Sequence, residues 1–333
     1  MSRCSSIVLM MYLCAPATAC LSAGDDPSAT GGTVGPGWES ATTTTDDGSI
    51  IIQRVAYRSG GLLIFGQVCR PTGPGPSPLV VANHDGVSGL AAWGGGACAE
   101  AARQGRVHIE SSYRGQDGSG GSIELCLGEV DDVLAMLEIA LAMPEVDRER
   151  VAMWGTGLGG CVTTRALQRG APVTAAASVL GISNLKTQYE QWRNGLGTGK
   201  GPSAQYQILM EAAHAAIGGP PEDFPDEYLR RSPALRATEI PGAIPLLLAH
   251  AVDDPIVSPR QSCELAQHLG VAGHHFDAQR QLVTTTPAGC ETAWTPAATP
   301  TGGWIAPRYL LVYDDPATLM SADVEGFLAA KLR

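Results

Sequence analysis

The residues best placed to do chemistry form the glycine-rich run Gly155-Thr156-Gly157-Leu158-Gly159-Gly160. Val151–Trp154, just before it, predicts a short buried strand, and a helical pattern follows from Leu158. A strand, a tight turn and a helix in this order are the setting of the nucleophile elbow G-x-S-x-G, whose serine attacks an acyl group. The middle position here is Gly157. The elbow therefore has its glycine frame but no hydroxyl nucleophile.

The composition narrows the class of protein. The chain has 333 residues, of which 44% are hydrophobic, enough for one large domain or two small ones. Its formal net charge of -11 argues against nucleic acid as a partner, because phosphate binding needs a basic surface. The sequence has no C-x-x-C pair and no histidine cluster with metal-ligand spacing. We therefore expect no zinc site and no cofactor.

The N-terminus, over residues 1–20, predicts an export signal. Arg3 supplies a positive charge, Ile7–Leu13 is a short apolar run, and Ala15–Ala19 supplies the small residues of a cleavage site. Cys20 comes next, in a pattern that resembles a bacterial lipoprotein box, although leucine is commoner than alanine three residues before the cysteine. We expect lipidation of Cys20 and a place in the bacterial cell envelope. Ordinary secretion with an incidental cysteine is the alternative.

A polar segment follows the signal. Residues 21–49 are rich in glycine, threonine, aspartate and proline and include the run Thr42–Thr45. Such a composition has little to bury and predicts a disordered tether. The apolar run of the signal is too short to cross a bilayer, so we expect membrane contact through the lipid anchor only.

Six cysteines follow the signal. They are Cys69, Cys98, Cys126, Cys161, Cys263 and Cys290. In an exported protein they permit disulfides, although the sequence does not decide the pairing. We expect one or two bridges between exposed loops, and we expect Cys161 to be a small buried residue on the helix after the elbow.

The folded part, residues 50–333, alternates strands with helices. Strands are predicted at Ser49–Tyr57, Leu62–Cys69, Pro78–Asn83, Val107–Ser111, Val151–Trp154, Val173–Leu180, Ile244–His250 and Tyr309–Tyr313. Helices are predicted at Ala91–Arg103, Glu129–Met143, from Leu158 onward, and at Pro259–Leu269 and Ala322–Leu332. Gly270–Ala306 reads as a long irregular stretch. The alternation predicts the α/β class, with a mostly parallel central sheet and helices on both faces.

Residues 184–232 interrupt this alternation. The segment is polar over Lys186–Lys200 and helical over Ala204–Ala216. We interpret it as a small helical cap inserted over the active-site edge of the sheet. A peripheral helical excursion that covers nothing functional is the alternative.

Four segments occur in an order that resembles a known family. They are Ser112-Tyr113-Arg114-Gly115, Pro144 to Val151, the elbow itself, and Ser232-Pro233 with Ile244 to Val257. They resemble the N-Y-R-G loop, the P-x-V-D-x-x-R-I lead-in, the elbow and the S-P … P-x-L-x-x-H-G-x-x-D-x-x-V segment of prolyl oligopeptidase catalytic domains and dienelactone-hydrolase-like esterases. From about Pro78 to its end, the chain thus resembles the α/β-hydrolase superfamily.

The resemblance implies acyl transfer by a serine, an aspartate and a histidine in that chain order. The acid position falls on Asp254, and the neighbouring Asp253 is the weaker candidate. The serine position falls on Gly157. The histidine is expected between the last strand and the last helix, but residues 314–320 contain none, and Thr318 is the nearest equivalent.

The resemblance also implies an oxyanion hole. One donor would be the amide of Leu158, the residue after the elbow position, and the second would come from the loop after His84, at Asp85. Amides of this kind can hold a carbonyl or a carboxylate, but without a nucleophile they do not cleave a bond.

Several other side chains could replace the missing nucleophile or the missing histidine. The candidates are Thr156, Cys161, His84, His250, His274 and His275. We expect Thr156 to point away from a substrate and Cys161 to face the sheet. His274 and His275 are expected to be solvated loop residues, and the other two histidines are expected to bond the backbone of their turns.

Two functions from different classes remain. The first is a non-catalytic lipoprotein with a hydrolase fold that binds a small ester, amide or peptide ligand. The second is an active esterase or peptidase with a rearranged or water-based site. A weaker third reading makes the fold a scaffold, with the cap as an interaction surface. The elbow glycine favours the first, and a side chain near it that pairs with a free histidine would favour the second.

Overall fold

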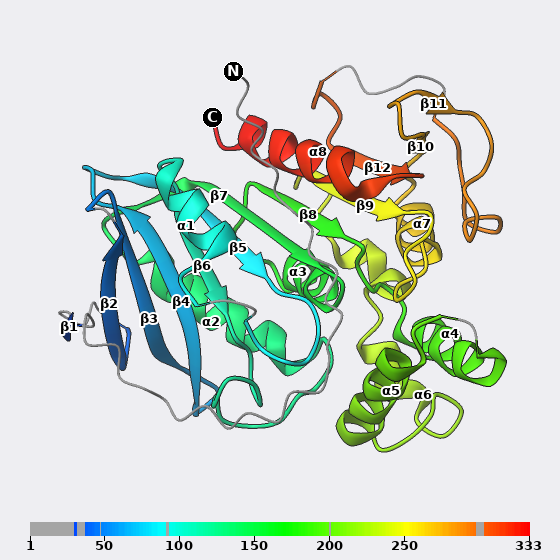
Figure 1. The fold of residues 1–333 in the computed structure, drawn as a ribbon, viewed down its shortest axis with the longest axis horizontal. Helices are drawn as coiled ribbons and strands as arrows, with labels where there is room; N and C mark the ends of the chain where they lie inside the picture. The colour runs from blue at the N-terminus through cyan, green and yellow to red at the C-terminus, as the bar shows by residue number, and fades with distance from the viewer. Residues whose placement is uncertain (1–29, 32–36, 47, 91–92, 200, 298–302) are drawn as a thin grey trace.

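A mixed sheet runs through the molecule. The computed structural model describes residues 30–31, 37–46, 48–90, 93–199, 201–297 and 303–333, and these ranges form twelve strands in the order β1-β2-β3-β4-β6-β5-β7-β8-β9-β12-β10-β11 (Figure 1). The strands are β1 (Thr30–Gly31), β2 (Ser40–Asp46), β3 (Ile50–Ser59), β4 (Leu62–Pro71), β5 (Ser77–Asn83), β6 (Val107–Ser111), β7 (Val146–Thr156), β8 (Ala175–Val179), β9 (Leu246–Ala251), β10 (Gly273–Phe276), β11 (Leu282–Val283) and β12 (Arg308–Tyr313).

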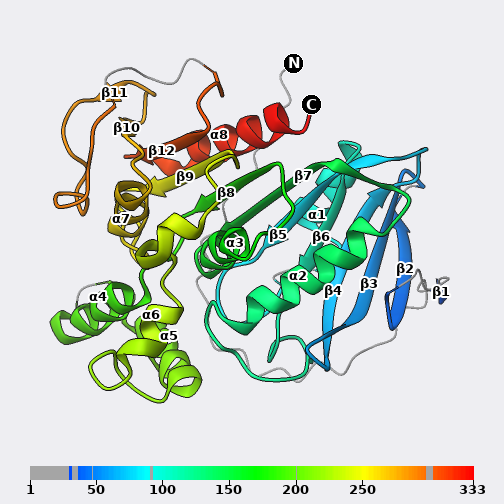
Figure 2. The ribbon, with the colours of Figure 1, turned by 180° about the vertical axis from the view of Figure 1, so that it is seen from behind.

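Helices cover both faces of this sheet. They are α1 (Gly96–Arg103), α2 (Gly128–Leu141), α3 (Leu158–Gln168), α4 (Leu185–Thr198), α5 (Ser203–Ile217), α6 (Pro225–Arg230), the 3-10 helix η1 (Pro233–Glu239), α7 (Arg260–His268) and α8 (Pro316–Lys331). Helices α1 and α8 lie on the face seen in Figure 1, and α2 and α3 lie on the opposite face, seen in Figure 2. Within the described ranges, every helix is too short or too polar to span a bilayer.

The central strands are parallel. From β6 through β5, β7, β8, β9 and β12 to β10, each strand runs parallel to its neighbour, whereas β1–β4 and β11 add antiparallel edges. The predicted α/β class is therefore confirmed. Because parallel strands end at one edge, the loops after β5, β7 and β9 lie along the same side of the sheet.

Alternating side chains of the central strands build two cores. On β7, Val151 and Met153 belong to the core beneath α2 and α3, whereas Ala152 faces the core beneath α8. Strand β5 alternates in the same way, with Leu79 on the first side and Val80 on the second. This alternation buries both faces, which explains the nearly continuous apolar runs in the sequence.

The helices α4, α5 and α6 form the insertion between β8 and β9. Their aromatic residues, among them Tyr189, Trp192 and Tyr206, share one buried cluster with Leu158 of α3 and with Val257 of the loop after β9. The insertion therefore packs directly against the start of the elbow helix.

Four expectations about segments were wrong. The predicted tether is not irregular throughout, because β2 pairs with β3 over its whole length, and a threonine run suits a strand. The stretch Gly270–Ala306 contains β10 and β11, and the polar segment Lys186–Lys200 is mostly helix α4. The last helix begins at Pro316, six residues before the expected start, since proline suits the first helical turn. The predicted signal and Cys20 lie outside the described residues.

The cysteine predictions also need correction. Three disulfides join Cys69 to Cys98, Cys126 to Cys161, and Cys263 to Cys290. All six residues are buried rather than placed on exposed loops. Cys161 is buried, as expected, but it is half of a bridge that ties α3 to the loop after β6.

Candidate active site

The elbow keeps its backbone conformation without its side chain. Gly157 lies between β7 and α3 with φ 55° and ψ -114°, and its carbonyl accepts hydrogen bonds from the amides of Gly160 and Ile182. A Cβ on Gly155 or Gly159 would overlap backbone atoms of neighbouring segments. The glycines flanking the elbow are thus required by close backbone packing. The positive φ at residue 157 is strained for any other residue type.

The carboxylate of Asp85 fills the space next to Gly157. One of its oxygens, Oδ1, accepts hydrogen bonds from the amide of Leu158 at 2.9 Å and from the amide of Gly86 at 2.7 Å. A Cβ built on Gly157 would overlap this carboxylate. The sequence led us to expect the backbone of Asp85 at the oxyanion hole. The structure shows its side chain there, accepting the bond that the Leu158 amide would offer to an oxyanion.

The environment of Asp85 changes its acidity. The residue is open to solvent on one side, yet the surrounding protein displaces water from the carboxyl group, and this loss of solvation raises its pKa. The hydrogen bonds from Leu158 and Gly86 and the charge of His84 act in the opposite direction, and the charge of Asp254 adds to the rise. The influence of Asp254 indicates that the two carboxylates share one electrostatic neighbourhood.

Asp254 lies on the loop after β9, at the same edge of the sheet as Gly157. Its Oδ1 accepts hydrogen bonds from the amides of Ile256 and Val257, both at 2.8 Å. Strand β9 is separated from β7 only by β8. The assignment of Asp254 to the acid position stays a prediction.

The cap holds this loop in place. Gln188 and Trp192 of α4 both donate hydrogen bonds to the carbonyl of Ile256, at 2.8 and 3.1 Å. The hydroxyl of Tyr206, on α5, donates to the carbonyl of Pro255. Side chains of the insertion thus fix the backbone that carries Asp254.

The expected histidine position contains Thr318, in the first turn of α8. A histidine–carboxylate pair at this end of the sheet joins His275 of β10 to Asp314, which follows β12, with 2.7 Å between Nε2 and Oδ1. The other ring nitrogen of His275 lies 3.1 Å from the carbonyl oxygen of Thr285. Each ring nitrogen of His275 therefore faces an acceptor, the carboxylate of Asp314 on one side and the carbonyl of Thr285 on the other.

Two other rescue candidates are committed elsewhere. Cys161 is in a disulfide and has no thiol. His250 is buried between the hydroxyl of Ser262 and the carbonyl of Val257, and burial lowers its pKa, which favours the neutral ring. His84 stacks on Tyr113 with 4.0 Å between ring centroids, and its Nδ1 lies 3.0 Å from the carbonyl oxygen of Asp85. Among the described residues, its buried Nε2 has no hydrogen-bond partner.

The prediction that His274 and His275 are solvated was wrong, because both are buried on β10. The sequence signal for this strand was weak, since its four residues contain one large apolar side chain.

Within the described ranges, no group of three or more histidine, cysteine or acidic residues is arranged to hold a metal ion.

Comparisons with known proteins agree on the architecture. Acetyl xylan esterase 1 from Thermoanaerobacterium sp. JW/SL YS485 matches with a TM-score of 0.59 and 13% identity, over 90% of this chain and 89% of the esterase. A puromycin-hydrolyzing peptidase of Mycobacterium tuberculosis matches with a TM-score of 0.58 and 20% identity, over 88% of this chain. The chain spans 45% of that peptidase's length. The fold is the α/β-hydrolase fold.

The sequence itself has relatives. The uncharacterized peptidase YtmA of Bacillus subtilis (strain 168) is 26% identical over 216 residues, which are 65% of this chain and 78% of the relative. The prolyl oligopeptidase family matches residues 100–282, more than half of the chain. The protein belongs to the prolyl oligopeptidase family.

Proposed function

We propose that this protein is a non-catalytic binding protein built on a prolyl oligopeptidase-type hydrolase domain. The observation that carries the proposal is the position of the Asp85 carboxylate. It accepts the hydrogen bond of the Leu158 amide and occupies the space that a Cβ on Gly157 would fill. A negatively charged group at this place repels a developing oxyanion, so the arrangement opposes acyl transfer.

The missing triad histidine supports the same proposal. Residues 314–320 contain no histidine, and both ring nitrogens of His275 face acceptors. An elbow without a nucleophile can bind a ligand but cannot form and release an acyl-enzyme.

The ligand that we propose is a small ester, amide or peptide. The relatives support this class, since one is named an acetyl xylan esterase and another a puromycin-hydrolyzing peptidase. The residues that would face such a ligand are the Asp85–Leu158 pair and Asp254 under the cap.

We also propose that the protein is exported and anchored to the membrane of a bacterial cell envelope by a lipid on Cys20. The charge, apolar run and small residues before Cys20 motivate this proposal. Three disulfides support it, because such bridges persist in oxidising compartments and are rare in the cytosol.

The proposal is tested by measuring whether the protein binds candidate ligands without hydrolysing them. The purified protein is incubated with a panel of aminoacyl amides and short peptides, the bound fraction is measured by equilibrium dialysis, and the compounds are then recovered and analysed by mass spectrometry. The proposal expects a bound compound that is recovered intact, with binding changed by Asp85→Ala and unchanged by Asp253→Asn. Release of hydrolysis products at a rate abolished by His275→Ala would favour the rearranged hydrolase instead.

A further inference from the structure

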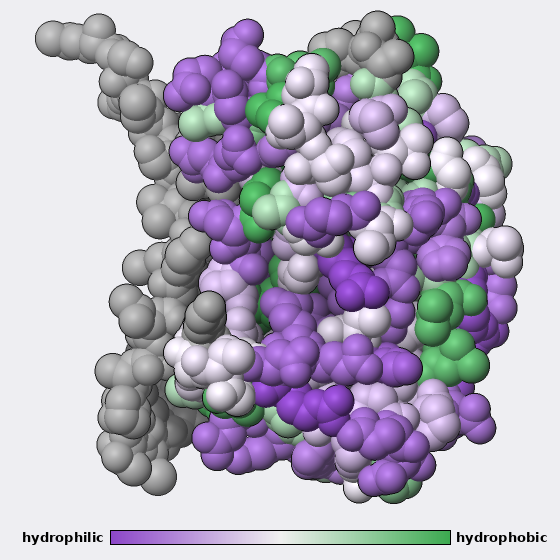
Figure 3. Space-filling view, turned by 90° about the vertical axis from the view of Figure 1, so that its right-hand side faces the viewer, coloured by the Kyte–Doolittle hydropathy of each residue, from purple (hydrophilic) through white to green (hydrophobic). Residues whose placement is uncertain are grey.

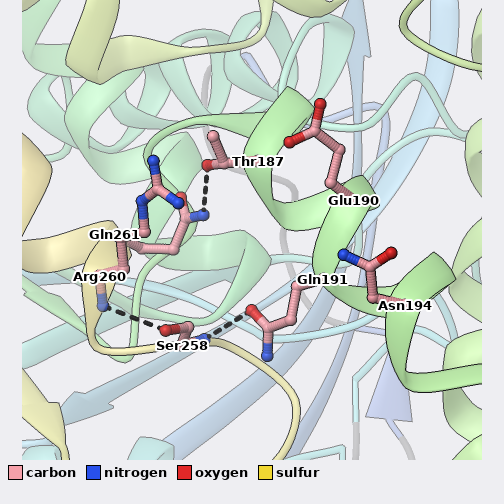
Figure 4. A pocket seen from close by; sticks show the side chains of 7 residues that line it. All are labelled: Thr187, Glu190, Gln191, Asn194, Ser258, Arg260 and Gln261. Carbon is pink, nitrogen blue, oxygen red and sulfur yellow. Dashed lines mark hydrogen bonds between the residues drawn. The ribbon is translucent and has the colours of Figure 1, made fainter. Parts of the chain in front are cut away.

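A separate cavity lies between the cap and the start of α7. It has a volume of about 250 Å³ and shares no lining residue with the elbow (Figure 4). One wall is a face of α4, made of the polar residues Thr187, Glu190, Gln191 and Asn194. The other wall is the segment Ser258, Arg260 and Gln261. The α4 residues recur at helical spacing, so they lie on one side of the helix while its apolar residues face the cap core.

The base of this cavity is held rigidly. Gln261 is buried, and its Nε2 donates to Thr187 Oγ1 at 3.0 Å while its Oε1 accepts from the amides of Ser183 and Asn184. Gln191 Oε1 accepts from the amide of Ser258 at 3.1 Å, which joins the two walls. A cavity whose walls are cross-linked by hydrogen bonds stays open without a ligand, and preorganisation of this kind favours binding.

Two side chains of opposite charge line this cavity. Among the described residues, neither the carboxylate of Glu190 nor the guanidinium of Arg260 takes part in a hydrogen bond or an ion pair, although the charge of Glu190 acts on Arg193 of the same helix. The neighbouring Arg193 is already paired with Glu222. Glu190 stands on the α4 wall and Arg260 on the wall opposite (Figure 4). The remaining lining groups are amides and hydroxyls.

We propose that this cavity binds a small zwitterion, a free amino acid or dipeptide. Arg260 recognises the carboxylate, since a guanidinium fork matches two carboxylate oxygens, and Glu190 accepts the ammonium group. The absence of apolar or aromatic groups among the seven lining residues suits a ligand with small or polar side chains. The volume is below the roughly 300–1,000 Å³ of sites for drug-sized ligands, which suits a ligand of one or two residues.

The zwitterion site does not depend on the proposed ligand binding at the elbow. The two sites are nevertheless linked through helix α4 and the loop after β9. Ser258 follows Val257, whose amide is bonded to Asp254, and Gln191 lies on the same helix as Gln188 and Trp192. A zwitterion seated against Gln191 and Ser258 therefore stabilises the loop that carries Asp254.

Isothermal titration calorimetry with the dipeptide Gly-Ser tests the proposal. We expect binding by the unmodified protein and a loss of about tenfold or more in affinity for Glu190→Gln and for Arg260→Gln, because each removes a charge-assisted contact. N-acetyl-Gly-Ser and Gly-Ser amide lose affinity to a similar extent. The control variant Arg236→Gln removes an exposed arginine on η1, outside the cavity, and leaves the affinity unchanged.

The measurements distinguish a failed zwitterion site from unfolded variants and from a failure at the elbow. Both variants change exposed or half-buried side chains without partners, so their thermal unfolding stays that of the parent protein, which a melting curve checks. No binding of Gly-Ser, or equal binding of the capped and uncapped dipeptides, overturns the zwitterion site. Asp85→Ala leaves this titration unchanged, so a failure here is distinguishable from a failure at the elbow.

Discussion

The carboxylate of Asp85 occupies the space that a Cβ on Gly157 would fill. Its Oδ1 accepts the hydrogen bond of the Leu158 amide at 2.9 Å. The two residues are therefore coupled: a nucleophile at residue 157 requires the carboxylate of Asp85 to move away. Because Gly157 has no side chain, the carboxylate of Asp85 can lie next to it. That carboxylate accepts the hydrogen bond of the Leu158 amide, which a catalytic elbow would donate to the oxyanion.

Gly157→Ser tests this coupling through stability. We expect the free energy of unfolding to fall by about 2–5 kcal/mol, from the positive φ and from the overlap with Asp85. In an Asp85→Ala background the cost falls to about 1–3 kcal/mol, the part caused by the strained backbone alone. Urea unfolding of the four proteins of this double-mutant cycle measures the difference.

Gly60→Ser is the matched control for that cycle. Gly60 has φ 54°, close to that of Gly157, but a Cβ there would meet nothing within 4 Å. Its substitution reports the cost of the backbone conformation without the overlap. Additive costs for Gly157→Ser and Asp85→Ala would mean that the two residues do not compete for space.

The acidity of Asp85 gives a second prediction. Loss of solvation raises its pKa above the value of about 3.9 for an unperturbed aspartate. The native state therefore holds this proton more tightly than the unfolded chain. The resulting stabilisation is full below the unfolded pKa and is lost as the pH rises through the folded pKa. A carboxyl carbon NMR titration locates that folded value.

The titration also tests the neighbourhood of Asp85. Asp254→Asn lowers the pKa of Asp85, because the charge of Asp254 contributes to raising it. Asp253→Asn is the control, since the adjacent Asp253 is not among the largest influences on the Asp85 carboxyl. Equal shifts from both substitutions would contradict the assignment of Asp254 to the site.

The disulfide Cys126–Cys161 leads to a third prediction. It links residues 35 apart in sequence and attaches the loop after β6 to the elbow helix. Replacing both cysteines by serine should lower the free energy of unfolding by about 3–4 kcal/mol in the chain-entropy picture. Non-reducing peptide mapping checks the pairing itself, and a peptide that joins Cys161 to any cysteine other than Cys126 would be inconsistent with the fold.

The anchor gives a fourth prediction. Cys20→Ser should move the protein from the membrane fraction to the soluble envelope fraction, because the lipid would have no attachment point. Cys14→Ser, directly after the apolar run of the signal, is the control and leaves the distribution unchanged. Fractionation and immunoblotting measure the two variants, and persistent membrane association of Cys20→Ser would sink the lipid-anchor proposal.

The sequence was informative where periodicity and glycine positions constrain the backbone. The strand Val107–Ser111 was predicted with its observed bounds, and the elbow followed from the spacing of its glycines. Long apolar runs and fixed turns are local signals. They need no knowledge of distant contacts, so one sequence is enough to read them.

The sequence was uninformative where distant residues decide the structure. Asp85 follows a strand that is separated from Gly157 by more than seventy residues, and only the tertiary fold reveals where its carboxylate points. The short strand β10 was missed because its four residues are stabilised by pairing with β12 rather than by local propensity. The disulfide of Cys161 was missed because pairing depends on proximity in space.

Hydrolysis of p-nitrophenyl acetate by the unmodified protein, measured beside His275→Ala and Thr156→Val, tests the non-catalytic account most directly. We expect a rate near that of buffer. Any acceleration should stay within the roughly 10³-fold that binding and amide donors alone can give, and it should be the same in all three proteins. Robust turnover by the unmodified protein that either substitution abolishes would contradict the account and identify an active, rearranged hydrolase.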